Sequence, residues 1–299
     1  MNAMKNFNIF IIILVVAVVF GLGVAGVLAI NRAVTIEDSQ GNKVQAVSNV
    51  LKPTEKPTEK PTVIPTQAPT EPPTETPLNG FVEVDGVRRY YVNGLVQSDT
   101  VVGSDEEGYF YVGSYGTVDN GYCNGISVND TDWIVIEGSA YKVKTKSDKY
   151  LFMAARDVCE CTDTGMTHEE KLKACFDYIK TKYGEGIQHD PAYPPTKSDW
   201  YLVYADDIFV KGWGDCYSFG AAYAFMARAI GCTESYACNS TGHGWSEVEG
   251  KVYDPEWSLH SKNYSYYAMT YDEPCDVPYK GALAVGKEYK RVQIVINAE

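Results

Sequence analysis

The first pattern along the chain is a long apolar run near its start. Residues 7–30 form a stretch of 24 residues without a charged side chain. About 20 apolar residues cross a bilayer as a helix, whereas the core of a cleavable signal peptide usually has only about 7–15. The run therefore predicts an uncleaved signal-anchor, although Val27 and Ala29 would also satisfy a small-residue cleavage rule. Lys5, with no acidic residue before the run, predicts a cytoplasmic tip within residues 1–31 and a single-pass protein whose remainder is extracellular.

The second pattern is a repeat without any hydrophobic period. A proline recurs every four residues from Pro53 to Pro77, and threonine follows the first six of these prolines. Such a segment cannot bury a core and prefers the extended polyproline II conformation. Residues 32–78 are therefore predicted to be an extracellular spacer, and the proline repeat alone would reach roughly 75 Å at about 3.1 Å per residue.

Strand-like patterns rich in Tyr, Val and Gly follow over residues 80–145. Gly94, Gly116 and Gly138 are 22 residues apart, and an aromatic or aliphatic strand segment precedes each of them. This spacing predicts stacked hairpins, none of which can bury its apolar face alone. We expect a small all-β repeat module over residues 79–147. It loosely resembles the aromatic-rich repeats of cell-wall-binding proteins, which makes a cell-wall glycan a candidate partner beside a purely structural role.

Helical periodicity begins in the last part of the chain, residues 148–299. Thr167 and Glu170 form a capping-box pattern, and the apolar positions after them predict a helix over residues 168–183. A second helix is predicted over residues 216–230 and is followed by glycine. This helix is apolar nearly all round, which is typical of a helix in the middle of a domain.

Four short strand patterns accompany the second helix, at residues 234–238, 244–248, 251–253 and 291–297. Glu249-Gly250 predicts a two-residue hairpin turn that pairs Val248 with Lys251. In that register residues 243 and 254 share one face of the sheet, one diagonal step apart. The pattern as a whole predicts an α+β domain, with the helix that carries Cys216 packed on an antiparallel sheet.

The charge of the chain narrows the choice of partners. The net charge is −13, and all of the excess lies after residue 78, where 33 acidic side chains face 20 basic ones. This balance argues against nucleic acid as a partner. A soluble, non-adhesive extracellular surface is the simpler interpretation, ahead of a dedicated site for cationic substrates.

Eight cysteines in a chain predicted to lie outside the cell suggest disulfides. The sequence leaves the candidate bridges open: Cys232 with Cys238, and Cys123 with Cys159 or Cys161. Cys175 lies on the apolar face of the first helix and is predicted to be a free, buried thiol. The single-residue gap in Cys159-Glu160-Cys161 is too short for a zinc knuckle, and we expect neither a metal nor another cofactor.

Three residues suited to thiol catalysis occur in order along this last part. Cys216 lies at the start of a predicted helix, where the helix dipole and unpaired N–H groups favour the thiolate. His243 stands between two glycines and Asp254 precedes Pro255, on two neighbouring predicted strands. A cysteine nucleophile needs a base to take its proton and a carboxylate to orient that base. Each residue alone has an ordinary structural explanation, but the conjunction favours a Cys–His–Asp triad.

The same stretch offers groups for stabilising an oxyanion. The backbone N–H of Cys216 is the natural first donor, because it lies at a helix start. Candidates for a second donor or for a substrate wall are Tyr193, Trp200, His189 and Trp245. Asp215 would disfavour a thiolate beside it and is a candidate to cap the helix instead.

Three motifs carry a resemblance to a known family: Gly-Asp-Cys-Tyr-Ser-Phe at 214–219, His-Gly-Trp-Ser-Glu-Val at 243–248 and Val-Tyr-Asp-Pro at 252–255. Together with residues 190–195 and Asp199-Trp200, they resemble the transglutaminase-like superfamily, whose core is a papain-like cysteine fold. The resemblance covers roughly residues 150–299. It implies a catalytic triad of Cys216, His243 and Asp254, the residues that the local argument also selects.

The resemblance implies chemistry through a thioester but leaves the reaction open. We expect a membrane-anchored, extracellular, cysteine-dependent amide hydrolase with a peptide or protein substrate, because water resolves a thioester unless the site excludes it. One alternative is a protein-glutamine transglutaminase that cross-links surface proteins. Another is a catalytically inactive cell-wall binding protein. The layout is similar to that of anchored, repeat-bearing surface proteins of Gram-positive gut bacteria.

Overall fold

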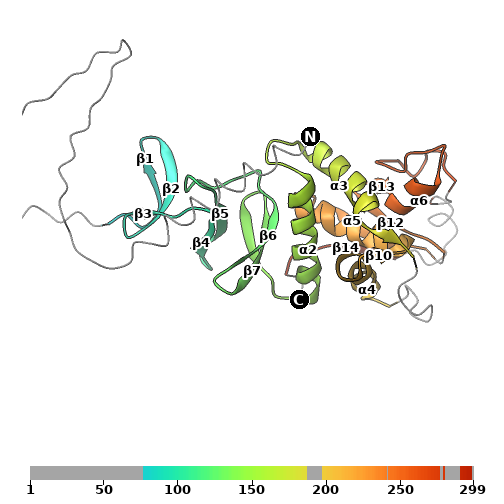
Figure 1. The fold of residues 1–299 in the computed structure, drawn as a ribbon, viewed down its shortest axis with the longest axis horizontal. Coiled ribbons are helices and arrows are strands. Elements are labelled where there is room, and N and C mark those ends of the chain that lie inside the picture. The colour runs from blue at the N-terminus through green and yellow to red at the C-terminus, as the bar shows by residue number, and fades with distance from the viewer. Residues whose placement is uncertain (1–76, 187–196, 241, 277–278, 280–289, 298–299) are drawn as a thin grey trace, which may run out of the picture. The chain divides into compact units, whose positions relative to one another are not determined.

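The structure is a computed structural model that describes residues 77–186, 197–240, 242–276, 279 and 290–297 (Figure 1). The apolar run at residues 7–30 and the proline repeat lie outside these residues, so the anchor and the spacer stay predictions. None of the helices in the described part has the length and apolar character needed to cross a bilayer. All described residues belong to one compact unit.

Two antiparallel sheets occupy residues 80–142 (Figure 1). The first has the order β1-β2-β3, formed by Gly80–Val84, Val87–Val92 and Leu95–Val96. The second has the order β4-β5-β8-β7-β6, formed by Thr100–Ser104, Gly108–Val112, Ser139–Lys142, Thr131–Ile136 and Asn124–Val128.

Tight turns with left-handed backbone close these hairpins. Asn93-Gly94 joins β2 to β3 and Glu137-Gly138 joins β7 to β8, and all four residues have positive φ, as type I′ turns require. Gly116 also has a positive φ. It lies in the turn after β5, which is closed by an isolated bridge between Val112 and Val118. The predicted strand-and-turn pattern around the three spaced glycines is confirmed.

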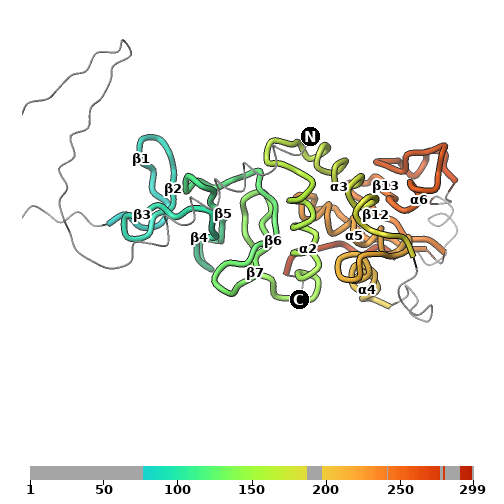
Figure 2. Tube along the Cα trace, in the orientation of Figure 1, coloured from blue at the N-terminus to red at the C-terminus, as the bar shows by residue number. Residues whose placement is uncertain are grey.

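Three long helices follow: α2 (Lys146–Cys161), α3 (His168–Lys182) and α5 (Cys216–Ile230) (Figure 2). The two helices predicted from periodicity, α3 and α5, are confirmed to within one residue. From Ser218 onward every residue of α5 except Arg228 is buried. The helix packs against α2, α3 and α4 (Trp200–Asp206) and against the strands β11 and β12. It therefore forms the centre of the main hydrophobic core.

The longest element that the pattern did not predict is α2. It begins with a capping box, in which Thr145 accepts the N–H of Asp148 and the Asp148 carboxylate accepts the N–H of Thr145. Its buried face shares the main core with Ile134 and Ile136 of β7. The second sheet and the helices are thus joined by one hydrophobic core.

A four-stranded antiparallel sheet lies against α5, in the order β13-β12-β11-β14. Its strands are Lys251–Tyr253, Gly244–Val248, Ser235–Asn239 and Lys290–Gln293. The described part therefore has mixed α and β structure with antiparallel sheets, as predicted. The last strand was predicted over residues 291–297 but ends at Gln293. Beyond it the chain leaves the sheet, and the N–H of Asn297 donates to the Asp148 carboxylate near the start of α2.

The hairpin of β12 and β13 has the predicted register. Val248 pairs with Lys251 and Ser246 with Tyr253. Glu249 and Gly250 form the two-residue turn, with φ of 50° and 77°. The ladder stops at Tyr253, one residue before Asp254.

The eight cysteines all lie in the described part, and all are free thiols. The candidate bridges of Cys232 with Cys238, and of Cys123 with Cys159 or Cys161, are therefore not formed. The two sulfurs that lie close together are those of Cys161 and Cys175, 3.6 Å apart between α2 and α3. Cys175 is buried, as predicted from its place on the apolar face of α3.

Candidate active site

Cys216 is the first residue of α5, and Asp215 caps the helix. The Asp215 carboxylate accepts the N–H of Tyr217 at 3.0 Å and that of Ser218 at 3.2 Å, so the capping prediction is confirmed. The next N–H, of Phe219, donates to the Asp215 carbonyl. Among the described residues, the N–H of Cys216 has no acceptor, which leaves one donor of the helix start open beside the thiol.

A glycine contact brings His243 next to Cys216. A Cβ atom on Gly244 would lie 2.5 Å from the Cα of Tyr217, closer than any side chain allows. The start of β12 therefore lies directly against the first turn of α5. Cys216 and His243 immediately precede these two touching residues, and consecutive Cα atoms are only about 3.8 Å apart. The backbone contact thus places the thiol and the imidazole on adjacent segments.

The same approach of helix and strand continues one turn further along α5. A Cβ atom on Gly220 would lie 2.8 Å from the backbone of Trp245, so this position also needs glycine. The buried hydroxyl of Ser246 donates to the carbonyl of Gly220 at 2.7 Å. These contacts fix the distance between α5 and β12 and, with it, the placement of Cys216 relative to His243.

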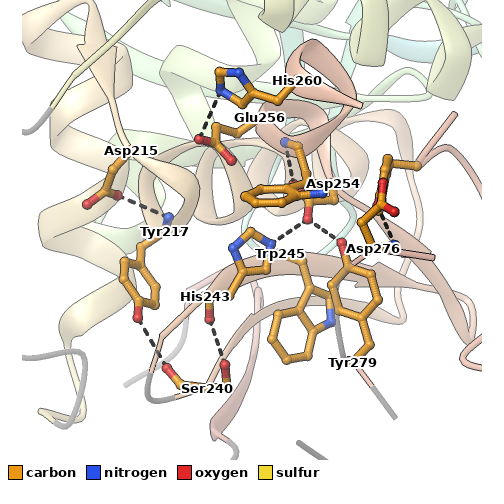
Figure 3. A network of polar contacts seen from close by, with 12 residues as sticks. Asp215, Tyr217, Ser240, His243, Trp245, Asp254, Glu256, His260, Asp276 and Tyr279 are labelled. Carbon is orange, nitrogen blue, oxygen red and sulfur yellow. Dashed lines mark hydrogen bonds and ion pairs between the residues drawn. The ribbon is translucent and has the colours of Figure 1, made fainter. Parts of the chain in front are cut away.

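His243 and Asp254 form a hydrogen-bonded pair (Figure 3). The Nε2 atom of His243 lies 2.5 Å from Oδ2 of Asp254, whose side chain is 1% exposed. The two residues were predicted to lie on neighbouring strands, but His243 precedes β12 and Asp254 follows β13. Asp254 instead caps the short helix α6 (Pro255–His260), and its Oδ1 accepts the N–H of Trp257 at 3.0 Å. The cap fixes the carboxylate, because Oδ1 is occupied while Oδ2 faces the imidazole.

The surroundings of His243 favour its protonated form. Burial alone would lower its pKa, but the charge and the hydrogen bond of Asp254, followed by the hydrogen bond with Cys216, raise the pKa of His243 to about 10. Since Nε2 is bonded to Asp254, Nδ1 is the nitrogen left for the thiol. In Figure 3 this second ring nitrogen points away from Asp254. A proton passed from Cys216 to His243 is therefore retained at neutral pH.

Tyr279 is a further member of this network that the sequence did not indicate. Its hydroxyl donates to Oδ2 of Asp254, the atom that also binds His243 (Figure 3). Its buried ring lies 5.1 Å from that of Trp245 and 5.9 Å from the imidazole, between ring centroids. Burial, with the charge of Asp254, raises the pKa of Tyr279, so the hydroxyl stays protonated as a donor. No motif marks this tyrosine, because its role depends on a distant segment of the chain.

Two tryptophans hold the imidazole in place. The ring of Trp245 stacks on that of His243 at a centroid distance of 6.2 Å and an interplanar angle of 15°. Trp257 meets the same imidazole edge-on at 5.6 Å. Trp245 was a candidate donor or substrate wall, but it is buried and its indole N–H donates to the Tyr271 hydroxyl at 3.1 Å. Its observed position is that of a support for the imidazole.

Trp200 is the one remaining candidate donor that the structure describes. It is fully buried on α4, and its ring meets that of Tyr217 edge-on at a centroid distance of 6.4 Å. Within the described residues its indole N–H has no acceptor. His189 and Tyr193 lie outside the described residues.

A second histidine, His260, lies at the border of the site. Its Nε2 atom lies 3.4 Å from the Glu256 carboxylate (Figure 3). It also lies 3.2 Å from the carboxylate of Glu185 in strand β9 (Gly184–Glu185), a contact that joins α6 to β9. Burial and the nearby charge of Asp254 raise the pKa of Glu256. No role was predicted for His260, whose partners come from two separate segments.

Comparison of the chain with protein-family models, with curated proteins and with solved structures yields no match. The description of the site therefore depends on its own geometry. That geometry combines a half-buried thiol at a helix start, an imidazole with a high pKa and a fixed carboxylate. Such an arrangement is suited to nucleophilic chemistry at a carbonyl carbon.

Proposed function

We propose that the chain is a cysteine-dependent amide hydrolase of the transglutaminase-like type, acting on a peptide or protein substrate. The observation that carries the proposal is the 2.5 Å hydrogen bond from His243 to Asp254, with Cys216 left to the other ring nitrogen. This bond fixes the tautomer and orientation of the imidazole, which is the function of the third member of a catalytic triad. The motifs around the three residues support the same assignment.

In the proposed reaction the Cys216 thiol passes its proton to Nδ1 of His243, and the thiolate attacks the amide carbon. The carbonyl oxygen becomes an oxyanion that accepts the N–H of Cys216 at the start of α5, which has no acceptor among the described residues. When the tetrahedral intermediate collapses, the C–N bond breaks and the His243 imidazolium gives its proton to the leaving amine. A thioester then remains on Cys216. Water, deprotonated by His243, hydrolyses it to a carboxylate and restores the thiol.

No second donor to the oxyanion is assigned among the described residues. Trp200 is fully buried, as Trp245 is, so neither indole N–H is open to a substrate in this structure.

The proposed cellular setting follows from the sequence pattern. Residues 7–30 would hold the enzyme in the cell membrane, with the spacer and the folded part outside. The two sheets at residues 80–142 would lie between the spacer and the catalytic part, where cell-wall glycan is a candidate partner. A vestigial triad on a wall-binding protein is the opposite hypothesis, and loss of Cys216 separates the two.

The test uses the full-length chain in detergent micelles, offered a library of peptide and isopeptide amides. The wild-type chain should hydrolyse at least one class of amide, and Cys216→Ala should lower that rate by a thousandfold or more, as loss of a nucleophile does. Cys159→Ala, which removes a half-buried thiol of α2, is the matched control and should keep the wild-type rate. Release of ammonia with incorporation of an added amine would indicate transfer instead of hydrolysis. Equal turnover by wild type and Cys216→Ala would exclude the proposed enzyme.

A further inference from the structure

Two thiols outside the candidate active site face each other between α2 and α3. The sulfur atoms of Cys161 and Cys175 are 3.6 Å apart. Cys161 is the last residue of α2 and is half-buried, whereas Cys175 is buried on the inner face of α3. A disulfide bond is about 2.05 Å long, so a movement of roughly 1.5 Å would bring the two sulfurs to bonding distance.

Polar contacts along the same interface hold the two thiols opposite each other. Lys182 of α3 donates to the Asp157 carboxylate at 2.7 Å and to the Glu160 carboxylate at 3.2 Å. The Tyr178 hydroxyl also donates to Glu160. Partners that lie further along α2 thus meet partners that lie earlier on α3, as in an antiparallel pair of helices. The two sulfurs are the next contact in this order, so the register of the helices fixes their approach.

The position of Cys161 at a helix end allows the remaining movement. Thr162, the residue after it, has extended backbone with φ of −129° and ψ of 165°. The Cys161 sulfur also lies 3.6 Å from the carbonyl of Val158, and a thiol is only a weak donor. Cys175, in contrast, is enclosed in the main hydrophobic core. A change of rotamer at Cys161 would therefore close the distance while α3 stays in place.

The surroundings give the two thiols different roles. Burial, followed by the hydrogen bond with Cys161, raises the pKa of Cys175 well above its ordinary value. Cys175 is therefore the protonated donor of the pair. Cys161 is the thiol that an external reagent can reach, because its side chain is half-buried. Thiol–disulfide exchange begins with the thiolate that meets the external disulfide, which here is Cys161.

We propose that Cys161 and Cys175 form a disulfide by exchange with an external disulfide, either a small molecule or a protein, as the oxidant. The Cys161 thiolate attacks one sulfur of that disulfide, so that a mixed disulfide forms and one thiolate leaves. Cys175 then loses its proton, and its sulfur attacks the sulfur of Cys161 and displaces the second thiolate. The chain gains one S–S bond and loses two hydrogens, and the oxidant becomes two thiols.

The bond would join two helices that pack against α5. Both α2 and α3 contact α5, and the Tyr223 hydroxyl of α5 donates to the Leu172 carbonyl of α3 at 2.9 Å. A cross-link that closes a loop of about 15 residues restricts the unfolded chain and so stabilises the folded one. In the proposed extracellular setting the disulfide would stabilise the helices around α5. The inference does not depend on any catalytic role of Cys216.

The test treats the reduced full-length chain in detergent micelles with oxidised glutathione. The remaining thiols are then blocked with iodoacetamide in urea, and the tryptic peptides are mapped without reduction. Trypsin separates the two thiols onto peptides 157–171 and 174–180, each of which ends at a lysine. Wild type should give these two peptides joined by a link that dithiothreitol removes. Cys159→Ala, which removes the other thiol of the first peptide, should give the same link, and Cys161→Ala should give none.

Thermal unfolding provides a second readout. The Tm of the oxidised wild-type chain should lie roughly 5–10 °C above that of the reduced chain, as expected for a loop of this length. Cys159→Ala should keep this difference and Cys161→Ala should lose it. The same Tm in both states of the wild type, with the link present, would overturn the stabilising role.

The peptide map also contains the results that would overturn the disulfide itself. These are Cys175 recovered with the iodoacetamide label, glutathione that stays on Cys161, or a link from Cys161 to another cysteine. Neither the map nor the Tm requires turnover of a substrate. Failure of the proposed function would therefore leave this inference standing, and failure of this inference would leave the proposed function standing.

Discussion

The sheets at residues 80–142 and the site around Cys216 are built in opposite ways. In the sheets, strands that are neighbours in sequence pair through tight turns, as in β1-β2, β4-β5, β6-β7 and β7-β8. In the site, Cys216, His243, Asp254 and Tyr279 come from four separate segments that meet only because each packs near α5 or the sheet beside it. The first region depends on local turn chemistry, whereas the second depends on the central core.

The largest difference between the two regions should come from truncating one phenylalanine in each. Phe225 of α5 is fully buried among the rings of Tyr150, Tyr201 and Phe209, so Phe225→Ala should lower the free energy of unfolding by about 3–5 kcal/mol. Phe81 of β1 is only half-buried, and Phe81→Ala should lower the free energy of unfolding by about 1–2 kcal/mol. Urea unfolding measures both. Equal losses would contradict the contrast between a local region and a central core.

A smaller effect is expected from one methyl group placed on either side of His243. In Gly244→Ala the new Cβ would lie 2.5 Å from the Cα of Tyr217, which should force β12 away from α5 and cost about 1–3 kcal/mol. Gly242→Ala is the matched control, because its Cβ would meet no atom within 4 Å. Thermal unfolding followed by circular dichroism should show a lower Tm for Gly244→Ala only. A similar Tm for both variants would disprove the tight contact between helix and strand.

Some elements around the site could be predicted from the sequence, because residues close to them in the chain determine where they begin, turn and end. The apolar run after Cys216, its cap Asp215 and the closing Gly231 together predict α5 with its observed bounds. The Glu249-Gly250 turn predicts the register of β12 and β13. The grouping of Cys216, His243 and Asp254 was predictable because each of these residues belongs to a motif of its own.

Other elements could not be predicted, because tertiary packing decides them. The short helix α6 was not predicted: Asp254 was placed on a strand, although proline at a first helical position is common. Trp245 was a candidate for a second donor or a substrate wall, and its burial could not be predicted, because that burial depends on Tyr279 and Tyr271, which lie in other segments. The approach of Cys161 to Cys175 likewise requires α2, which was not predicted.

The pH dependence of stability should reflect the pair of His243 and Asp254. The pKa of His243 is raised in the folded chain from 6.5 to about 10, so its stabilisation is complete below pH 6.5 and is lost as the pH rises toward 10. Between pH 6.5 and 8 the free energy of unfolding of the wild type should fall by about 1–2 kcal/mol more than that of Asp254→Asn. Asparagine keeps the helix cap and removes only the charge. If urea unfolding gives both chains the same dependence of the free energy of unfolding on pH, then Asp254 does not hold the proton on His243.

The smallest expected effect concerns the hydroxyl of Tyr279. Tyr279→Phe removes one donor to Asp254 and keeps the ring that packs on Trp245. The free energy of one hydrogen bond corresponds to a factor of roughly two to ten, so the rate of Cys216 alkylation should change by that factor. Tyr264→Phe removes the hydroxyl of a half-buried tyrosine outside the triad and is the matched control. An equal change in both variants would remove Tyr279 from the network.

The most direct test of the account is the alkylation of Cys216 by iodoacetamide at pH 6, followed by peptide mapping of the full-length chain. If His243 accepts and keeps the thiol proton, wild-type Cys216 should react at least about tenfold faster than Cys216 in His243→Ala, because a free cysteine with a pKa of about 8.5 is almost entirely protonated at that pH. Equal, slow reaction of Cys216 in both chains would contradict the account.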